Sequence, residues 1–492
     1  MSSKLTLLTL LLAGSFTSQS TAEVPKILPE GFSVETIPTP LDENGKPLFF
    51  DIGGIAFTED GTAVVASRLH GIWKYHEKTW SQFCDSLHDP LGIHLAKPDG
   101  SAIVIAQKPE LTGIEDTDRD GKADAFNTLA DQWRYAGNYC EYVHGPVVDK
   151  AGNYFISINS AHIGNDLHNT LPPESKRGMG SFLGYDGWAA KITEDGKFIP
   201  YASGFRSAAG IGISPEDELF ITDNQGDWVG TSTLYHVRKG GFYGHPGSLA
   251  DLPEYRTGSG KNLAGDAEHL NGIRTLPTLL LPHGELVNSP GNPAFNTITF
   301  GPFQGQIFMG CQTRSNIVRA DLQLVKGEYQ GVVFNFIDHL QSGCLRLTFS
   351  PQGELWVGQT GRGWRSQGSA EYGLQKVKWD GSVPFEIRTI KLTSKGFRVE
   401  FTRPADLQSL TEEDISVNHW FYKYSKEYGS PKMDERSETP KIIGRSADGL
   451  SMEFEVPLFP QRLYHIAVDV RSPSGERPSV SSGYYTLNKL MD

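Results

Sequence analysis

An acidic loop carries the most specific chemical motif in the sequence. Four aspartates occupy the first, third, fifth and ninth positions of one short segment: Asp116, Asp118, Asp120 and Asp124. Gly121 at the sixth position allows a tight turn, and calcium takes about six to eight oxygen ligands in such loops. Position twelve is Asn127 rather than glutamate, so the loop is not an EF-hand. We predict a calcium site that braces the fold without catalysing; magnesium or a solvated acidic turn is the alternative.

Charged and amide side chains flank a hairpin that recurs along the chain. These flanking residues include Arg68, Glu141, His144, Arg206, Asp223, Asn224, Gln225, Asp227, Gln312, Arg346 and Arg362. Such groups cost desolvation energy when they gather, unless they are paired or used. Arginine binds carboxylates in a fork, and amides match hydroxyl groups. The set predicts a site for a polyhydroxylated or carboxylated ligand; for any single residue, a solvated loop or a salt bridge is the alternative.

The hairpins themselves predict the fold that brings these residues together. Six copies begin at residues 54, 92, 145, 210, 297 and 346, each with an apolar strand, a Pro/Asp/Gly turn and a second apolar strand. Further alternating strands lie between the copies, which is the pattern of propeller blades. We predict an all-β chain with a six-bladed β-propeller over residues 28–380, whose hairpin ends converge on a central channel. A two-sheet sandwich is the alternative.

The sequence pattern changes after residue 380. Segments 396–401, 451–456, 464–470 and 484–487 alternate apolar and polar residues with a period of two. Such alternation is typical of antiparallel sheets with one solvated face. We predict a small Ig-like β-sandwich over residues 384–492 with a structural or docking role, because it contains no convergent acid, base or metal set.

The N-terminus predicts export. Lys4, the apolar stretch 5–14 and the small residues 20–22 together form a secretory signal, with a buried helix as the alternative. We therefore expect residues 1–22 to be a signal peptide and the protein to be periplasmic or secreted. No apolar run is long enough to predict a transmembrane segment.

Composition excludes several classes of function. The formal net charge is −13, from 45 Lys+Arg and 58 Asp+Glu, and no basic block occurs, so no nucleic-acid partner is expected. Zincin, serine-hydrolase, P-loop and Rossmann motifs are absent. The four cysteines are Cys84, Cys140, Cys311 and Cys344. Disulfides and buried thiols are both open for them.

Three stretches in the middle of the chain carry a family resemblance. They are Gly-Phe-Arg-Ser-Ala-Ala-Gly at 204–210, Thr-Asp-Asn-Gln-Gly-Asp at 222–227, and Lys-Gly-Gly-Phe-Tyr-Gly-His-Pro at 239–246. Here the chain resembles the glucose/sorbosone dehydrogenases, six-bladed propellers that use pyrroloquinoline quinone (PQQ). Segments 107–124 and 137–146 resemble more specifically a "membrane-bound dehydrogenase" branch common in planctomycetes.

The resemblance implies roles for particular residues. Arg206 and Arg346 match arginines that contact the quinone. We also expect Gln225, in the polar floor of the site with Asp223 and Asn224, and Gln312 to contact the cofactor. Backbone carbonyls at Gly226 and Asp227 match those that hold the calcium ion.

This chain also departs from the family pattern. The catalytic histidine of the family falls near Glu141, with His144 three residues further on. The lysine that holds the quinone falls near Gln312, and another arginine falls at Cys344. A carboxylate can replace the base if burial raises its pKa. The loss of two cations weakens the match to a tricarboxylate cofactor.

The resemblance implies an exported, calcium-assisted quinoprotein-like oxidoreductase that acts on a sugar or a sugar-derived alcohol or aldehyde. Glu141 or His144 would be the base, and Arg206 would bind anionic groups. Because no haem motif is present, electrons would pass to a separate soluble carrier such as a cytochrome or a cupredoxin. The alternatives are a carbohydrate- or protein-binding propeller without turnover, and a calcium-dependent lactonase or other hydrolase.

Overall fold

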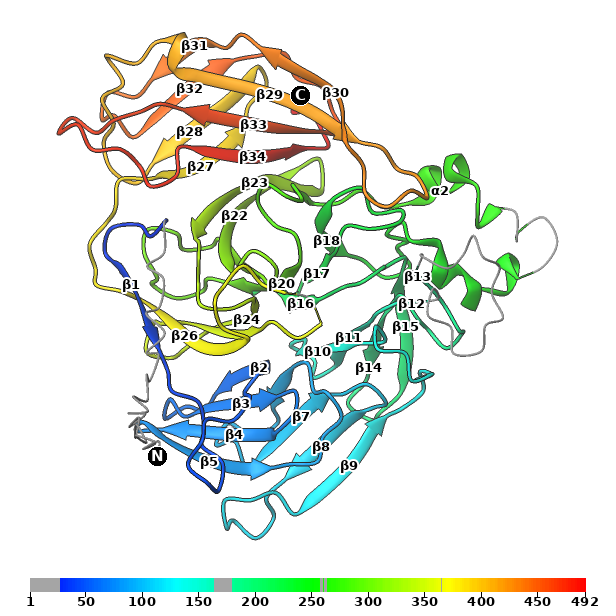
Figure 1. Cartoon of the computed structure of the whole chain (residues 1–492). Helices are drawn as coiled ribbons and strands as arrows, with labels where there is room; N and C mark the ends of the chain where they lie inside the picture. Colours follow the sequence, from blue (N-terminus) through cyan, green and yellow to red (C-terminus); the bar gives the residue numbers. More distant parts are fainter. Residues whose placement is uncertain (1–26, 163–178, 257–259, 261–262, 364) are drawn as a thin grey trace, which may run out of the picture.

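The computed structural model describes residues 27–162, 179–256, 260, 263–363 and 365–492, and these fold almost entirely into antiparallel β-sheets (Figure 1). The expected signal peptide, residues 1–22, lies outside the described residues. Among the described residues, no helix is long and apolar enough to cross a membrane.

Six antiparallel sheets follow one another along the chain, and each contributes four strands to a ring. The first three blades are β2 (Ile52–Phe57), β3 (Ala63–Ser67), β4 (Gly71–His76) and β5 (Thr79–Cys84); β6 (Ile93–Leu95), β7 (Ala102–Ala106), β8 (Leu111–Glu115) and β9 (Ala125–Ala130); and β10 (Val143–Val148), β11 (Tyr154–Ile158), β14 (Trp188–Ile192) and β15 (Phe198–Ser203). The other three are β16 (Gly210–Ile213), β17 (Leu219–Asp223), β18 (Ser232–Val237) and β19 (Leu279–Leu281); β20 (Pro290–Phe295), β21 (Ile307–Cys311), β22 (Asn316–Val325) and β23 (Glu328–Ile337); and β24 (Cys344–Phe349), β25 (Leu355–Thr360), β26 (Tyr372–Trp379) and β1 (Phe32–Thr36).

The first strands of the six blades contact one another in cyclic order. β2 contacts β6, β6 contacts β10, and the contacts continue through β16, β20 and β24 back to β2. The backbones approach so closely that a Cβ on Gly92 would lie 2.0 Å from the carbonyl oxygen of Gly145, and one on Gly210 would lie 2.3 Å from Cα of Asn292. This packing explains why glycine precedes or begins several of the hairpins. The arrangement is consistent with the predicted six-bladed propeller.

The fifth hairpin begins earlier than the sequence pattern suggested. The apolar segment from residue 297 was expected to be its first strand, but the strand is β20, and residues 296–306 form the turn region before β21. Two prolines, Pro290 and Pro293, made the true strand look like a loop. They are tolerated because β20 is an edge strand with a register shift between them.

The N-terminal strand completes the last blade. β1 pairs with β26 from Phe32 opposite Trp379 to Thr36 opposite Gln375, so the beginning and the end of the propeller share one sheet. The Phe32 ring packs against Phe300 and Phe336 at centroid distances of 5.3 and 5.1 Å. This closure couples the first residues of the ring to its last two blades.

The C-terminal residues form two facing sheets. One contains β27 (Ile387–Leu392), β28 (Gly396–Phe401), β32 (Ser451–Glu455) and β31 (Lys441–Arg445); the other contains β29 (Ile415–Tyr422), β30 (Lys432–Glu438), β33 (Arg462–Val468) and β34 (Ser482–Leu487). A buried apolar cluster that includes Phe397, Phe454 and Tyr485 lies between them. The predicted small antiparallel sandwich is therefore present, while its Ig-like classification stays a prediction.

The sandwich is continuous with the propeller. β34 pairs with β23 of the fifth blade, with Gly331 opposite Thr486 and Val333 opposite Tyr484, so that one sheet of eight strands spans both parts. Figure 1 shows the red C-terminal strands lying directly beside the green β23. Alternation alone predicted separate sheets, because strand pairing between distant segments leaves no mark on local periodicity.

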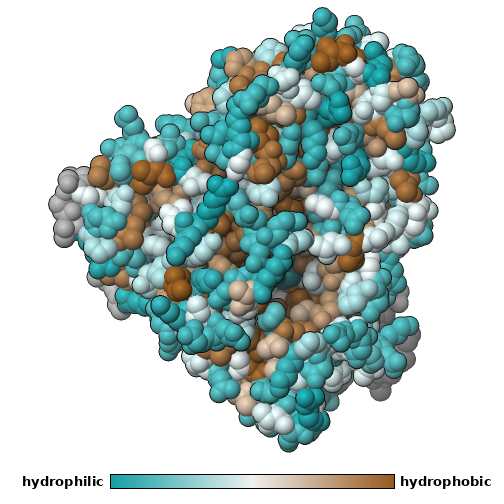
Figure 2. All heavy atoms as spheres, turned by 180° about the vertical axis from the view of Figure 1, so that it is seen from behind, coloured by the Kyte–Doolittle hydropathy of each residue, from teal (hydrophilic) through white to brown (hydrophobic). Residues whose placement is uncertain are grey.

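The remaining short elements are β12 (Ala161–His162), β13 (Met179–Gly180), the 3₁₀ turns Pro246–Asp251, Pro253–Tyr255 and Glu412–Asp414, and the helix α2 (Ala267–Ile273). Three of these six lie in the Gly- and Pro-rich stretch between β18 and β20. All four cysteines are described and carry free thiols, which settles the open choice in favour of thiols. Figure 2 shows one face of the molecule, where hydrophilic side chains cover most of the surface and apolar ones are seen mainly in recesses.

Replacing Phe32 by alanine tests the closure of the ring. The substitution leaves a cavity among Phe300, Phe303 and Phe336, and a buried Phe→Ala change costs about 3–5 kcal/mol of stability. Urea unfolding should show this loss, whereas Leu41→Ala, at a side chain that is 58% exposed, should change stability by less than about 0.5 kcal/mol. Equal stability of the two variants would show that the packing of Phe32 on β1 does not stabilise the closed ring.

Candidate active site in the central channel

A buried arginine crosses the middle of the ring. Arg346 on β24 donates from Nε to the carbonyl oxygen of Gly53 at 2.7 Å, and from Nη1 to those of Ala209 at 2.8 Å and Leu345 at 3.1 Å. Its Nη2 donates to the carbonyl oxygen of Leu91 at 3.0 Å. The guanidinium thus joins backbone from the first, second, fourth and sixth blades. Burial lowers the pKa of Arg346 to about 9.

The remaining N–H group of Arg346 fixes the state of His144. Nη2 lies 2.7 Å from Nδ1 of His144, and because arginine only donates, Nδ1 must accept. Burial, followed by the charge of Arg346, lowers the pKa of His144 well below its usual range. The imidazole is therefore neutral with its proton on Nε2, and this buried Nε2 has no hydrogen-bond partner. In this state His144 offers a donor and not a base.

Two cavities meet at His144. One, of about 160 Å³, opens between the first strands of the blades and includes Gly54, Arg346 and Asn292 in its wall. The other, of about 50 Å³, is named the channel pocket here, and it is lined by Arg68, Leu91, Tyr142, His144, Asn159, Ser207, Ala209, Asn224, Gln312, Leu345 and Arg362. Arg346 therefore lies in the partition between the two ends of the channel.

The channel pocket contains polar atoms that no protein group satisfies. Oδ1 of Asn159 and Oδ1 of Asn224 are buried without hydrogen-bond partners, like Nε2 of His144. Asn159 follows β11 and Asn224 follows β17, so the ends of the second strands of two neighbouring blades supply them. One N–H donor and two carbonyl acceptors suit a ligand that both donates and accepts, which a hydroxyl group does.

A cluster of charges forms one side of the pocket. Arg68 donates to both carboxylate oxygens of Asp89, at 2.7 and 3.1 Å, and its guanidinium lies 5.2 Å from the ring centre of Tyr142. Lys108 lies 4.5 Å from the centre of the same ring, and burial lowers the pKa of Lys108. Arg362 reaches Asp89 only at 3.9 Å and its side chain is 38% exposed. Arg362 is thus the cation of this cluster most available to an anionic ligand.

Arg206 is engaged by a second ion pair. Its Nε donates to Oδ1 of Asp227 at 2.7 Å, while Oδ2 of Asp227 accepts from the backbone N–H of Met179 and lies 3.2 Å from Nε2 of His245. Burial alone would raise the pKa of Asp227, but the hydrogen bond and charge of His245 and the charge of Arg206 outweigh it and lower that pKa. Asp227 is therefore satisfied, whereas Nη2 of Arg206 bonds no described residue.

The C-terminal sandwich reaches this ion pair. The connection between β29 and β30 donates from Gly429 N–H to the carbonyl oxygen of Gly226 at 2.8 Å, and Asp227 forms a β-bridge with Tyr428. The Tyr428 ring lies 5.2 Å from the Arg206 guanidinium. Gln225 donates from Nε2 to the carbonyl oxygen of Gly230. Nothing in the sequence pattern indicated that the second domain covers this turn.

Glu141, the predicted base, holds its own loop. Its carboxylate accepts from the backbone N–H groups of Ala136, at 3.2 and 3.1 Å, and Asn138, at 2.8 Å. Burial raises the pKa of Glu141, as the prediction required. The side chain does not line the channel pocket, however, whereas His144 does. The structure thus brings His144 and Gln312 to the pocket and leaves Glu141 beside it.

The residues predicted to hold PQQ and calcium do not fit these groups as they are arranged. A tricarboxylate needs free donors, but all five N–H groups of Arg346 are used and Arg206 is paired with Asp227. The Gly226 carbonyl accepts from Gly429, and Gln312 donates to the carbonyl oxygen of Arg362. A calcium ion at this turn would compete with those hydrogen bonds. No catalytic step is therefore derived through either group.

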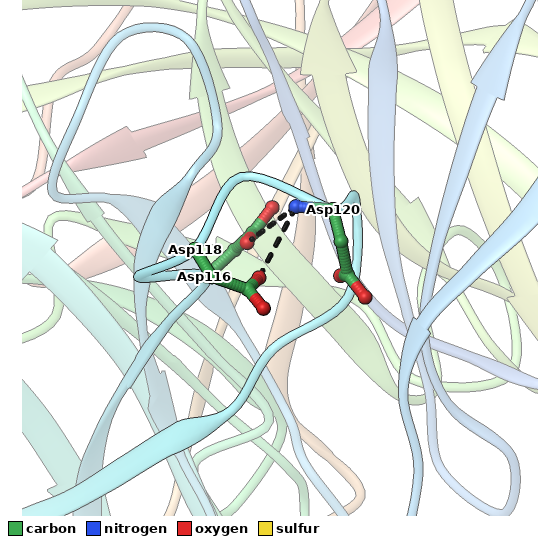
Figure 3. Close-up of side chains that lie close together, drawn as sticks. All are labelled: Asp116, Asp118 and Asp120. Carbon is green, nitrogen blue, oxygen red and sulfur yellow. Dashed lines mark hydrogen bonds between the residues drawn. The ribbon is translucent and has the colours of Figure 1, made fainter.

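The acidic loop lies between β8 and β9, away from the channel residues. Carboxylate oxygens of Asp116, Asp118 and Asp120 lie within 4.8 Å of one another, the distance expected of a metal site. Asp120 also donates its backbone N–H to Asp116 and Asp118, both at 3.2 Å (Figure 3). Asp124 is turned away from them, since it accepts from the hydroxyl and N–H of Thr117. Three of the four predicted ligands are grouped, and calcium binding itself stays a prediction.

Sequence reasoning missed two buried polar residues near the channel. Asn159 was not singled out, although it directly follows an apolar strand as Asn224 does. Asp51 precedes β2, is fully buried and has two carboxylate oxygens without partners; burial raises its pKa, and its nearest cation is Arg362 at 3.8 Å. The sequence signal that could have found both is their position at the end of an apolar hairpin, since Asp51 directly precedes β2 and Asn159 directly follows β11.

No protein-family model and no curated protein matches this sequence. Among solved structures, a protein of Carbohydrate-Active Enzymes Family AA12 from Trichoderma reesei is 14% identical, with a TM-score of 0.51, over 73% of this chain and 99% of that one. The PQQ domain of pyranose dehydrogenase from Coprinopsis cinerea is 13% identical, with a TM-score of 0.49, over 73% and 99% of the two chains. A glucose-dehydrogenase-type oxidoreductase from Thermus thermophilus is 16% identical, with a TM-score of 0.49, over 71% and 100%.

These neighbours include PQQ-type sugar dehydrogenases, as the sequence resemblance predicted. At such low identity the likeness concerns the fold alone. The planctomycete branch stays a prediction.

Arg346→Met tests the role of the central arginine. Methionine retains the bulk but removes every donor, so the carbonyls of Gly53, Ala209 and Leu345 and Nδ1 of His144 lose the hydrogen bond from Arg346, whereas the Leu91 carbonyl still accepts from Gly145 N–H at 3.3 Å. We expect a loss of at least about 3 kcal/mol in urea unfolding, because each buried polar group without a partner costs about 1–3 kcal/mol. Arg398→Met, at an exposed arginine on β28, is the matched control. Equal stability of the two variants would show that Arg346 does not brace the ring.

Calcium titration tests the acidic loop. If Asp116, Asp118 and Asp120 bind calcium, millimolar Ca²⁺ should raise the melting temperature, since a ligand that binds only the folded state stabilises it. Asp118→Asn should abolish most of this rise, whereas Asp195→Asn in an exposed turn should preserve it. A rise of the same size in both variants, or none in the parent protein, would refute the site.

Proposed function

We propose that the protein is a sugar-directed oxidoreductase whose substrate, a sugar or a sugar-derived acid, places a polar group in the channel pocket, since a volume of about 50 Å³ admits only part of such a molecule. The observation that carries the proposal is the convergence of His144 Nε2, Asn159 Oδ1 and Asn224 Oδ1 on one cavity, all three buried without protein partners. Buried groups of this kind are normally satisfied by a ligand or by ordered water. A polyol supplies both hydrogen-bond donors and acceptors for them.

Charge favours an acidic member of this substrate class. Arg362 borders the pocket with a partly exposed guanidinium, and its two carboxylate neighbours lie at 3.8 and 3.9 Å, beyond hydrogen-bond distance. A carboxylate on the ligand gains a charge-assisted hydrogen bond there. His144 would orient a hydroxyl or carbonyl oxygen through its Nε2–H, and Arg346 would hold the imidazole in that tautomer.

The enzymatic part of the proposal is supported by the fold shared with the AA12 protein, which belongs to a family of carbohydrate-active enzymes. PQQ and calcium are proposed as cofactors because the resembled family uses them. To hold the quinone, the hydrogen-bond donors at Arg206 and Arg346 would have to change partners. Export to the periplasm or medium, an external electron carrier, and the division into residues 1–22, 28–380 and 384–492 with an Ig-like last domain are proposed from the sequence.

A carbohydrate-binding propeller without turnover is the second candidate. The observation that favours it is that all five N–H groups of Arg346 bind protein groups and Arg206 is ion-paired with Asp227, while the family's lysine and second arginine correspond to Gln312 and Cys344. A lactonase has less support, because it would need a metal ion held by side chains in the channel. The candidate metal ligands found among the described residues, Asp116, Asp118 and Asp120, lie in the acidic loop.

Calorimetric titration with gluconate and glucose tests the site. We expect saturable binding, with His144→Ala and Asn159→Ala each weakening it at least about tenfold, which corresponds to about 1.4 kcal/mol. Asn44→Ala, at an exposed loop amide, is the matched control and should bind like the parent protein. Unchanged affinity in both pocket variants would refute the proposed site.

Dye-coupled oxidation separates the two candidates. The protein with added PQQ and calcium is assayed with the sugar that binds. Turnover that His144→Ala abolishes would support the oxidoreductase, whereas saturable binding without turnover would support the binding propeller. The absence of binding would exclude both.

A further inference from the structure

A cavity lies between the propeller and the sandwich. It has a volume of about 570 Å³, within the range of about 300–1,000 Å³ usual for ligand sites. Its wall comes from the loop before β18, from β18 and α2 of the fourth blade, and from the β29–β30 connection. We call it the interdomain pocket. Figure 1 shows α2 near the orange connection between β29 and β30.

Aromatic rings form much of this wall. Trp228 and Tyr424 pack at a centroid distance of 5.3 Å, and Tyr235 and Tyr422 also line the pocket. Backbone and side-chain hydrogen bonds fix the two packed rings: Trp228 N–H donates to the carbonyl oxygen of Ser425, and the Tyr424 hydroxyl donates to that of Gly244 at 2.5 Å. The aromatic surface is therefore formed before any ligand arrives.

One cation in the pocket lacks an anion. The Arg274 guanidinium lies 4.4 Å from the centre of the Tyr424 ring, and its Nε donates to Oδ1 of Asn271. No described carboxylate forms an ion pair with Arg274, although the side chain is half-buried. Lys423 also lines the pocket, as do Glu268 and Arg462, and Arg462 is ion-paired with Asp434, so Arg274 and Lys423 face one acid. The pocket therefore carries excess positive charge.

Two further polar groups in this wall are buried without partners. Thr233, 2% exposed, has an unsatisfied hydroxyl, and Arg462, 8% exposed, has an unsatisfied Nε, although its other nitrogens bind Asp434 and the carbonyl oxygen of His419. Buried polar groups are normally satisfied, so two on one cavity point to a ligand that supplies the missing partners.

We propose that the interdomain pocket is a second saccharide-binding site, distinct from the channel pocket, and that it takes a sugar carrying a carboxylate or a sulfate. Aromatic faces bind the apolar face of a sugar ring, and Arg274 with its two free terminal nitrogens binds the acidic group in a fork. Because the wall comes from both domains, the ligand would also fasten the sandwich to the fourth blade.

Calorimetry on the full chain tests this site with three probes: digalacturonate, galactose 6-sulfate and the neutral disaccharide galactobiose. We expect at least one acidic probe to bind at least about tenfold more tightly than galactobiose, and the better of the two identifies the acidic group. Arg274→Gln should weaken that binding about tenfold or more. His144→Ala in the channel pocket and Arg398→Gln on the exposed face of β28 should leave it unchanged.

A second variant protects the test against misfolding. If Arg274→Gln lowers the melting temperature markedly, Lys423→Gln at the pocket rim replaces it, with a loss of affinity and a weaker salt dependence as the expected result. Equal binding of neutral and acidic probes, loss of binding in His144→Ala alone, or no binding by any probe would overturn the proposal. The channel pocket is tested separately, by the titrations with gluconate and glucose.

Discussion

The structure depends on how a ring of β-sheets fills its own axis. Six first strands approach one another closely around the axis of the ring, and each buried backbone carbonyl there needs a hydrogen-bond donor. Arg346 supplies donors to four of them from three neighbouring blades and its own. A planar guanidinium suits this task, because its five N–H groups diverge in one plane and lysine offers only three.

The same arginine sets the chemistry of the pocket above it. By donating to Nδ1 of His144, it forces the imidazole proton onto Nε2 and keeps the ring neutral. The pocket consequently presents a donor from His144, acceptors from Asn159 and Asn224, and a cation from Arg362. A general base must come from another group, and the residue expected to be that base, Glu141, instead stabilises the loop 136–141. The hydrogen bond between Arg346 and His144 therefore joins the residue that holds the blades together to the proposed binding site.

Local patterns in the sequence predicted the blades, since an apolar strand, a turn and a second apolar strand are encoded within about fifteen residues. They also predicted that His144 and Gln312 would come to the channel. They could not predict β20, where edge-strand prolines imitate a loop, or the pairing of β34 with β23, which joins segments far apart in the chain. Family resemblance assigned Arg206 and Arg346 to a cofactor, yet residue type alone does not show that Asp227 and four carbonyls occupy them. Hydrogen-bond partners are a property of the folded chain.

The central claim is that ligands bind above an arginine that remains part of the fold. A crystal structure of the protein soaked with gluconate tests it most directly. The account predicts ligand oxygens within hydrogen-bond distance of His144 Nε2, Asn159 Oδ1 and Asn224 Oδ1, with Arg346 still bound to the carbonyls of Gly53, Leu91 and Ala209. A ligand carboxylate bound to Arg346 itself, with those backbone contacts broken, would contradict it.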